Sequence, residues 1–315
     1  MNRTIGYCTE TRPESCGFVL FGATGDLAAR KIIPALAGLC AQELIPKHFY
    51  VLFVARTALD RAAFEARLTA ALAGHPECAK ALLSRSEYLQ ADYDSPAFYL
   101  ELAARLAELD EKYAIKNKRL FYLATPPPAF EPIAMKLKDS GLLYDPGDSS
   151  CWSRIIIEKP YGSSLASACS LDSGLKKAVP ESQIYRIDHF TGKETVQNLL
   201  ALRSGNPLFE ETWNSRLLDH VQITVFEELG LEGRAGFFEH MGLARDMMSH
   251  ILQLAAVTAM DLPPGFGEKE FKEQKRKFFE SVVMPGPSSA EDFVRAQYAG
   301  YAAEPGVAPD SKTET

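Results

Sequence analysis

The fold of this chain is decided by the stretch Phe18-Val19-Leu20-Phe21-Gly22-Ala23-Thr24-Gly25-Asp26-Leu27. Its first four residues form an apolar run of strand-forming side chains that stops at a glycine. From Leu27 to Leu39 apolar residues recur at helical spacing, so a helix is expected directly after the glycine turn. A buried strand, a glycine turn and a helix in this order are typical of the first unit of a doubly wound parallel sheet.

The turn itself, Gly22-Ala23-Thr24-Gly25-Asp26-Leu27, is a candidate binding loop for a dinucleotide. The N-terminus of the following helix presents backbone N–H groups and a positive dipole end, which suit a pyrophosphate. Gly22 permits a tight turn, and Gly25 permits close approach of the backbone to a phosphate. The spacing is G-x-x-G rather than the longer G-x-G-x-x-G, and two glycines in such a turn also occur for purely conformational reasons.

The alternation of strands and helices continues as far as residue 187. Apolar runs predict strands at 50–55, 88–89, 119–124, 155–157 and 184–187, and helical spacing predicts helices at 62–72, 98–109, 130–137 and 165–177. This alternation indicates an α/β fold, a Rossmann-like doubly wound parallel sheet that is covered on both faces. Because ligands of such sheets bind beyond the carboxyl ends of the strands, functional side chains are expected at Gly22–Asp26, Arg56, Pro126 onward, and Lys159.

The pattern changes after about residue 186. Helices are expected at 194–202, 243–260 and 271–279, whereas residues 218–226 alternate as in a one-sided antiparallel strand. A further strand is expected at 294–301, and the polar stretch 304–315 is expected to be unstructured in isolation. The sequence thus predicts a flexible lead-in over 1–17, a nucleotide-binding domain over 18–185 and an incomplete α+β domain with antiparallel strands over 186–315.

Composition excludes several classes of protein. The 315 residues carry 34 basic and 41 acidic side chains, and the net charge of −7 argues against general nucleic-acid binding. No apolar run approaches the ~18 residues of a membrane span, and the N-terminus lacks the apolar core of a signal peptide. The six cysteines are scattered without a C-x-x-C pair. We therefore expect a cytoplasmic protein without a membrane segment, a metal site or a disulfide framework.

The end of the second predicted strand bears on the choice of cofactor. Sites specific for NAD carry an Asp or Glu there, which holds the ribose 2′-hydroxyl. This strand instead ends Val54-Ala55-Arg56-Thr57, and a guanidinium binds a 2′-phosphate in a bidentate manner. The sequence favours NADP over NAD, although an arginine at a strand end can also be merely solvated.

Two charged segments follow strands later in the chain. Glu158-Lys159-Pro160-Tyr161-Gly162 comes after the predicted strand at 155–157, and Arg186-Ile187-Asp188-His189-Phe190-Thr191-Gly192-Lys193-Glu194 joins a strand to a helix. With the glycine turn, the stretch 232–238 and Arg245-Asp246-Met247-Met248, these segments give the chain its resemblance to glucose-6-phosphate dehydrogenases, from about Phe18 to the last residue. The resemblance implies oxidation of glucose 6-phosphate to 6-phosphogluconolactone with NADP, the first step of the oxidative pentose phosphate pathway.

The resemblance also implies roles for single residues. His250 stands at the position of the family's catalytic base, and Asp188 at the position of the carboxylate that pairs with it. Such a pair suits the reaction, because imidazole titrates near neutrality and a carboxylate fixes its tautomer and stabilises the imidazolium. The other matches are His189 and Lys193 for the sugar phosphate, Lys159 for both cofactor and sugar, Glu227 and Asp246 for sugar hydroxyls, and Phe130 near the nicotinamide.

Each of these residues also has a purely structural explanation. A histidine on an apolar helix is more often a core residue, Lys193-Glu194 can simply begin a helix, and Glu227-Glu228 can be a solvated turn. Their occurrence together, in the order of the family, favours the functional interpretation.

The sequence departs from the family pattern at three points. Phe190 and Phe130 stand at positions where the family often has Tyr, which predicts weaker contacts. The family pattern Arg-Asp-x-x-x-x-His is one residue shorter here, and in a continuous helix this deletion turns Asp246 by about 100° relative to His250. Family members also continue past the position of Thr315, with most of an antiparallel sheet and the interface of a homo-oligomer.

Two alternatives follow from these departures. A truncated, non-catalytic chain would bind NADP through residues 18–185 without completing a sugar site. Another NADP-dependent oxidoreductase with a different substrate is disfavoured by His189 and Lys193, which suit a phosphosugar.

Overall fold

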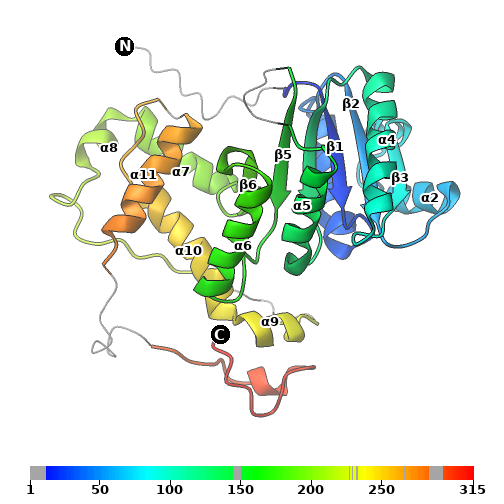
Figure 1. Cartoon of the computed structure of the whole chain (residues 1–315). Coiled ribbons are helices and arrows are strands. Elements are labelled where there is room, and N and C mark those ends of the chain that lie inside the picture. The colour runs from blue at the N-terminus through cyan, green and yellow to red at the C-terminus, as the bar shows by residue number, and fades with distance from the viewer. Residues whose placement is uncertain are drawn as a thin grey trace. The chain divides into compact units, whose positions relative to one another are not determined.

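The computed structural model describes residues 12–144, 150–226, 228, 230–231, 233–265, 267–283 and 294–315. The chain divides into two compact units. The first unit comprises residues 10–187, and the second consists mainly of residues 188–315. Figure 1 shows the strands gathered in the first unit and a group of helices in the second. No helix in the described part of the chain is long and apolar enough to cross a membrane.

The first unit contains one six-stranded parallel sheet. Its strands are β1 (Cys16–Phe21), β2 (Phe49–Ala55), β3 (Ser86–Gln90), β4 (Lys118–Leu123), β5 (Trp152–Ile157) and β6 (Ile184–Arg186). They lie in the order β3-β2-β1-β4-β5-β6, and every neighbouring pair is parallel. The order reverses between β1 and β4, the switch point at which doubly wound sheets bind nucleotides. The predicted Rossmann-like sheet is confirmed.

Helices cover both faces of this sheet. They are η1 (Ala28–Ile32), α1 (Ile33–Ala41), α2 (Arg61–Ala71), α3 (Pro76–Ser84), α4 (Pro96–Tyr113), α5 (Phe130–Asp139) and α6 (Leu165–Ala178), with short turns η2 (Pro127–Ala129) and η3 (Glu181–Gln183). Val19 and Phe21 pack into one core with side chains of α4, α5 and α6. These three helices lie in front of the sheet in Figure 1. Leu20, which points to the other face, packs into a second core with side chains of α1, α2 and α3. Because both faces are buried, the strands are continuous apolar runs.

The second unit is helical where it is regular. It contains α7 (Glu194–Gly205), α8 (Pro207–Thr212), α9 (Ala235–Met241), α10 (Leu243–Ala259), α11 (Glu268–Ser281) and the short turn η5 (Tyr301–Ala303). Val196 and Leu200 of α7 pack with Val257 and Met260 at the end of α10, and α11 adds Phe271 and Phe278.

The two strands predicted for this unit are wrong. Residues 218–226 and 294–301 form no strand, and Phe226 is 89% exposed. A strand is held by hydrogen bonds to a neighbouring strand, and the described residues of 188–315 contain no strand that could pair with either segment. The alternating apolar residues of 218–226 therefore do not form a strand.

The last residues are held by side-chain contacts, although they were expected to be unstructured in isolation. The amide of Gln297 donates to the carbonyl oxygens of Ser311 and Thr313 at 3.2 and 3.0 Å. Glu239 of α9 accepts hydrogen bonds from the buried Tyr301 hydroxyl at 2.8 Å and from the Ser311 hydroxyl at 2.7 Å. The segment therefore docks on α9.

Candidate functional site

The glycine turn is held at the switch point by the two neighbouring strands. Gly22 has φ +77°, and a Cβ added to it would lie 2.3 Å from the carbonyl oxygen of Ala124, which follows β4. The backbone N–H of Ala23 donates to the carbonyl oxygen of Val54 in β2 at 3.1 Å. Gly25 closes the turn by donating to the carbonyl oxygen of Gly22 at 2.9 Å. Only glycine fits this conformation and this close approach at position 22.

The outer part of the turn faces solvent at the start of the helix that continues into η1. Gly25, Asp26 and Leu27 are exposed, and Asp26 pairs with Arg30 one turn later at 2.6 Å. The N–H groups at the start of a helix lack intrahelical partners, so this surface suits the oxygens of a pyrophosphate. Buried Ala23 and half-buried Thr24 anchor the turn beneath it.

Three residues that sequence reasoning did not single out support the turn. The Tyr93 hydroxyl accepts a hydrogen bond from the Gly22 N–H at 3.1 Å, and burial raises the pKa of this tyrosine. Arg67 of α2 donates to the carbonyl oxygen of Thr24 at 2.9 Å, and the hydroxyls of Thr24 and Thr57 lie 3.1 Å apart. Tyr93 comes shortly after β3, so the rule that ligands gather at strand ends could have found it.

Three further predicted cofactor residues lie elsewhere in this unit. Arg56 is exposed directly after β2, where a guanidinium can reach a ribose 2′-phosphate. Lys159 is half-buried after β5, and its peptide bond to Pro160 is cis. Phe130 is only 1% exposed and belongs to the core on the α4–α6 face, so its contact with a nicotinamide stays a prediction.

In the second unit, Asp188 and His250 form a close pair. Nδ1 of His250 lies 2.8 Å from Oδ1 and 3.0 Å from Oδ2 of Asp188, and the His250 side chain is 3% exposed. Asp188 Oδ1 also accepts the backbone N–H of Phe190 at 2.9 Å. The carboxylate thus fixes the imidazole with Nδ1 as donor, and a base acting on a substrate would use Nε2.

Aromatic and cationic neighbours surround this pair. The Phe190 ring stacks on His250 with 4.0 Å between centroids, and the His189 ring meets His250 edge-on at 4.7 Å. The ammonium group of Lys193 lies 3.6 Å from the centroid of the Phe190 ring. The Phe190 ring therefore contacts both the Lys193 ammonium group and the His250 imidazole.

Lys275 of α11 is a further neighbour that the sequence did not indicate. It donates a hydrogen bond to Gln253 of α10, and burial lowers the pKa of its ammonium group, while the negative charge of Asp188 opposes that shift. The electrostatics of the pair therefore involve a cation from a neighbouring helix, α11.

A cavity of about 190 Å³ lies beside the pair, entirely within the second unit. Asp246 and His250 both line it, because they lie one turn apart on α10 and so share a face. The helix is continuous from Leu243, so the shortened spacing is realised as an i, i+4 pair. The other polar lining residues are His189, Arg234 and Tyr298. Arg234 and Tyr298 were not predicted, although Arg234 lies inside a stretch on which the resemblance rests.

The structure thus brings Asp188, His189, Asp246 and His250 together, with Lys193 close to Phe190 at their edge. Glu227 lies outside the described residues. Asp188, His189 and His250 also place one potential metal-ligand atom each within 4.8 Å. The direct hydrogen bond between Asp188 and His250 explains their proximity without a metal.

These features define a class of protein: a dinucleotide-binding α/β protein that carries a carboxylate–imidazole pair beside a cavity with both polar and apolar lining residues. Comparison with known proteins identifies the family. Residues 19–198 match the family model described as glucose-6-phosphate dehydrogenase, NAD binding domain, and residues 200–315 match glucose-6-phosphate dehydrogenase, C-terminal domain. The chain belongs to the glucose-6-phosphate dehydrogenase family.

Individual relatives agree. The chain is 38% identical to glucose-6-phosphate 1-dehydrogenase of Chlamydia muridarum over 95% of its own length and 62% of the relative's, and 39% identical to that of Treponema pallidum over 94% and 61%. Among solved structures, a glucose-6-phosphate dehydrogenase in complex with its substrate glucose-6-phosphate matches with a TM-score of 0.86 and 32% identity, covering 96% of this chain and 64% of that one. The enzyme from Mycobacterium avium matches with a TM-score of 0.82 and 33% identity over the same shares. The chain spans less than two thirds of these relatives' lengths.

Proposed function

We propose that the protein oxidises glucose 6-phosphate at C1 to 6-phosphogluconolactone and transfers the hydride to NADP, the first step of the oxidative pentose phosphate pathway. The observation that carries this proposal is the Asp188–His250 pair, with a buried imidazole, beside a cavity that has both polar and apolar lining residues, in a chain of this family. An alcohol oxidation needs a base for the hydroxyl proton, and this pair supplies one.

In this mechanism His250 takes the proton of the C1 hydroxyl through Nε2. Asp188 holds the Nδ1–H and stabilises the imidazolium that forms, as the 2.8 Å contact allows. NADP held at the glycine turn would supply the acceptor for the hydride that leaves C1. Asp246 accepts hydrogen bonds from sugar hydroxyls in the cavity, whereas His189 and Lys193 bind the phosphate as donors toward a dianion. The proposed roles of Lys159 and Glu227 toward the sugar rest on the family resemblance.

The proposed NADP site fits the residues that are present. The turn Gly22-Ala23-Thr24-Gly25-Asp26-Leu27 would hold the pyrophosphate through the N–H groups at the start of its helix, and Gly22 lets the turn pack against the Ala124 carbonyl, where a Cβ would clash. Arg56 binds the 2′-phosphate, since it offers a guanidinium where an NAD-specific site carries a carboxylate. Lys159 and Phe130 complete the proposed cofactor site. In domain terms, residues 18–185 bind the cofactor and residues 186–315 bind the sugar.

The setting of this activity is also part of the proposal. We place the protein in the cytoplasm, because its six cysteines are scattered without a C-x-x-C pair. No nucleic acid or membrane takes part.

The test is the appearance of NADPH absorbance when the protein is mixed with glucose 6-phosphate and NADP. His250→Asn should abolish turnover. The matched control is His240→Asn, because His240 is exposed on α9 and its replacement should leave the rate unchanged. Equal rates for His250→Asn and the unmodified protein would refute the mechanism.

The second candidate function is NADP binding without turnover. It is favoured by one observation, the lack of a strand over residues 218–226 in the unit that contains the cavity. Calorimetry that detects NADP binding to a chain that produces no NADPH would support this alternative, and turnover by the same chain would eliminate it. A third possibility, an NADP-dependent oxidoreductase of another substrate, requires preference for an unphosphorylated sugar.

A further inference from the structure

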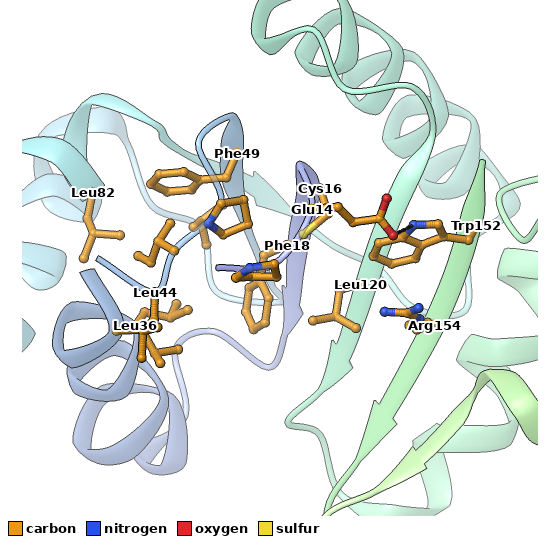
Figure 2. Close-up of a pocket in the computed structure, with 15 residues that line it drawn as sticks. Glu14, Cys16, Phe18, Leu36, Leu44, Phe49, Leu82, Leu120, Trp152 and Arg154 are labelled. Atoms are coloured by element: carbon orange, nitrogen blue, oxygen red, sulfur yellow. Dashed lines mark hydrogen bonds between the residues drawn. The ribbon is translucent and has the colours of Figure 1, made fainter. Parts of the chain in front are cut away.

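A second cavity, of about 210 Å³, lies in the first unit. Cys16 and Phe18 of β1, Phe49 of β2 and Trp152 of β5 line it, and these residues stand at or near the amino ends of their strands. The glycine turn follows the carboxyl end of β1, so this cavity lies toward the opposite ends of the strands. Figure 2 shows Glu14, Trp152 and Arg154 on one side of the cavity and Leu36, Leu44, Leu82 and Phe49 on the other.

The lining is apolar apart from a few groups. Leucines of α1 and of the loop after it line the space together with the rings of Phe18, Phe49 and Trp152. The Cys16 thiol is kept protonated, because burial raises its pKa to about 11. A protonated thiol is a weak nucleophile, so the cavity suits reversible binding rather than covalent chemistry.

The two charged lining residues differ in their surroundings. Glu14 accepts hydrogen bonds from Lys118 at 2.5 Å and from the Trp152 indole at 2.7 Å, and the bond from Lys118 is the main cause of its lowered pKa. The Arg154 guanidinium stacks on the Trp152 ring at 4.2 Å from its centroid and is half-buried. Among the described residues, no carboxylate forms an ion pair with Arg154. The charge of Arg154 contributes to the lowered pKa of Glu14, but the hydrogen bonds to the Glu14 carboxylate come from Lys118 and Trp152. One side of the cavity therefore carries a hydrogen-bonded anion and a cation that stacks on an indole ring.

We propose that this cavity binds a small aromatic acid, with its ring among the apolar side chains and its carboxylate on Arg154. The cavity volume of about 210 Å³ suits such a ligand, because a cavity of about 150 Å³ already holds benzene. The aromatic class is indicated by three lining rings, which pack well against a fourth. The acidic group is indicated by Arg154, since a stacked guanidinium binds carboxylates through two parallel hydrogen bonds.

The test is calorimetric titration of the full chain with 3-phenylpropionate, its neutral amide and octanoate, with and without saturating NADP. The acid should bind at least about tenfold more tightly than the amide, because only the acid offers a charge-assisted bond. NADP should leave this binding unchanged. Equal affinities of acid and amide, or competition by NADP, would overturn the proposal, and octanoate binding as tightly as the aromatic acid would overturn the choice of ligand class.

Variants locate the site. Arg154→Gln should weaken binding of the acid at least about tenfold, whereas Arg61→Gln, at an exposed arginine of α2, should not change it. Leu39→Trp should block the cavity, and its unfolding midpoint shows whether it folds. In a Trp213→Phe background, Trp152 is the remaining one of the chain's two tryptophans, so the acid should alter its fluorescence. Undiminished binding in Arg154→Gln, or unchanged Trp152 emission on saturation, would refute this location.

Discussion

Replacing Gly22 by alanine should both destabilise the first unit and weaken NADP binding. The left-handed conformation of this residue, with φ +77°, costs a non-glycine residue about 1–2 kcal/mol. The new Cβ would lie 2.3 Å from the carbonyl oxygen of Ala124. This oxygen is a backbone atom directly after the central strand β4, so it cannot move aside as a flexible side chain would. Overpacking of this kind costs about 1–3 kcal/mol. We therefore expect a loss of about 2–5 kcal/mol in the free energy of unfolding.

The assay combines urea unfolding with calorimetric titration of NADP. Any movement of the turn away from Ala124 displaces the phosphate-binding N–H groups, so affinity for NADP should fall at least about tenfold. The matched control is Gly38→Ala in α1, where a Cβ meets nothing within 4 Å and helix propensity should add up to ~1 kcal/mol of stability. If Gly22→Ala keeps both its stability and its NADP affinity, the clamped turn is not what fixes the cofactor loop.

Four further predictions test other parts of the molecule. Asp188→Asn should lower kcat about a thousandfold with unchanged NADP affinity, because a carboxylate in contact with an imidazolium, with the two charges about 4 Å apart, stabilises it by roughly 4 kcal/mol at an effective dielectric constant near 20; a steady-state kcat within threefold of the parent would contradict this. Arg56→Ser should weaken NADP at least about tenfold while sparing NAD, as measured by parallel titrations. An alanine inserted after Met248 should turn Asp246 by about 100° away from His250 and weaken binding of glucose 6-phosphate in calorimetry, whereas tighter binding would show that the short spacing is a defect. Asp110→Ala should cost about 3–5 kcal/mol in urea unfolding, because it leaves the buried Arg119 guanidinium without its 2.8 Å partner; a change below 1 kcal/mol would count against that ion pair.

The parallel sheet could be predicted because its strands are buried on both faces. Each strand then becomes a continuous apolar run, and a run such as Phe49–Ala55 is recognisable without knowledge of its neighbours. The pairing of Asp188 with His250 was predicted only through family resemblance. These residues are 62 positions apart, and no local pattern connects them.

Other features could not be predicted from the sequence, for identifiable physical reasons. The helix α3 (Pro76–Ser84) went unpredicted because it is short and buries only Cys78 and Leu82. The alternation over residues 218–226 specifies which side chains share a face, but a strand also needs a partner, which is a property of other residues. Lys275 reaches the charge of Asp188 from α11, and a pattern of charged residues on a helix cannot reveal such a contact.

The clamp around Gly22 explains why a weak sequence motif makes a specific site. The pattern G-x-x-G states only that the backbone is free to turn, and that freedom is common. Here three long-range contacts fix the turn: the Tyr93 hydroxyl with the Gly22 N–H, the Val54 carbonyl with the Ala23 N–H, and the Ala124 carbonyl against the Gly22 Cα. They come from the ends of β2 and β4 and from the segment after β3, so the requirement for glycine arises in the assembled sheet rather than from the phosphate alone. Preorganisation of this kind lowers the cost of ordering the loop when a dinucleotide binds.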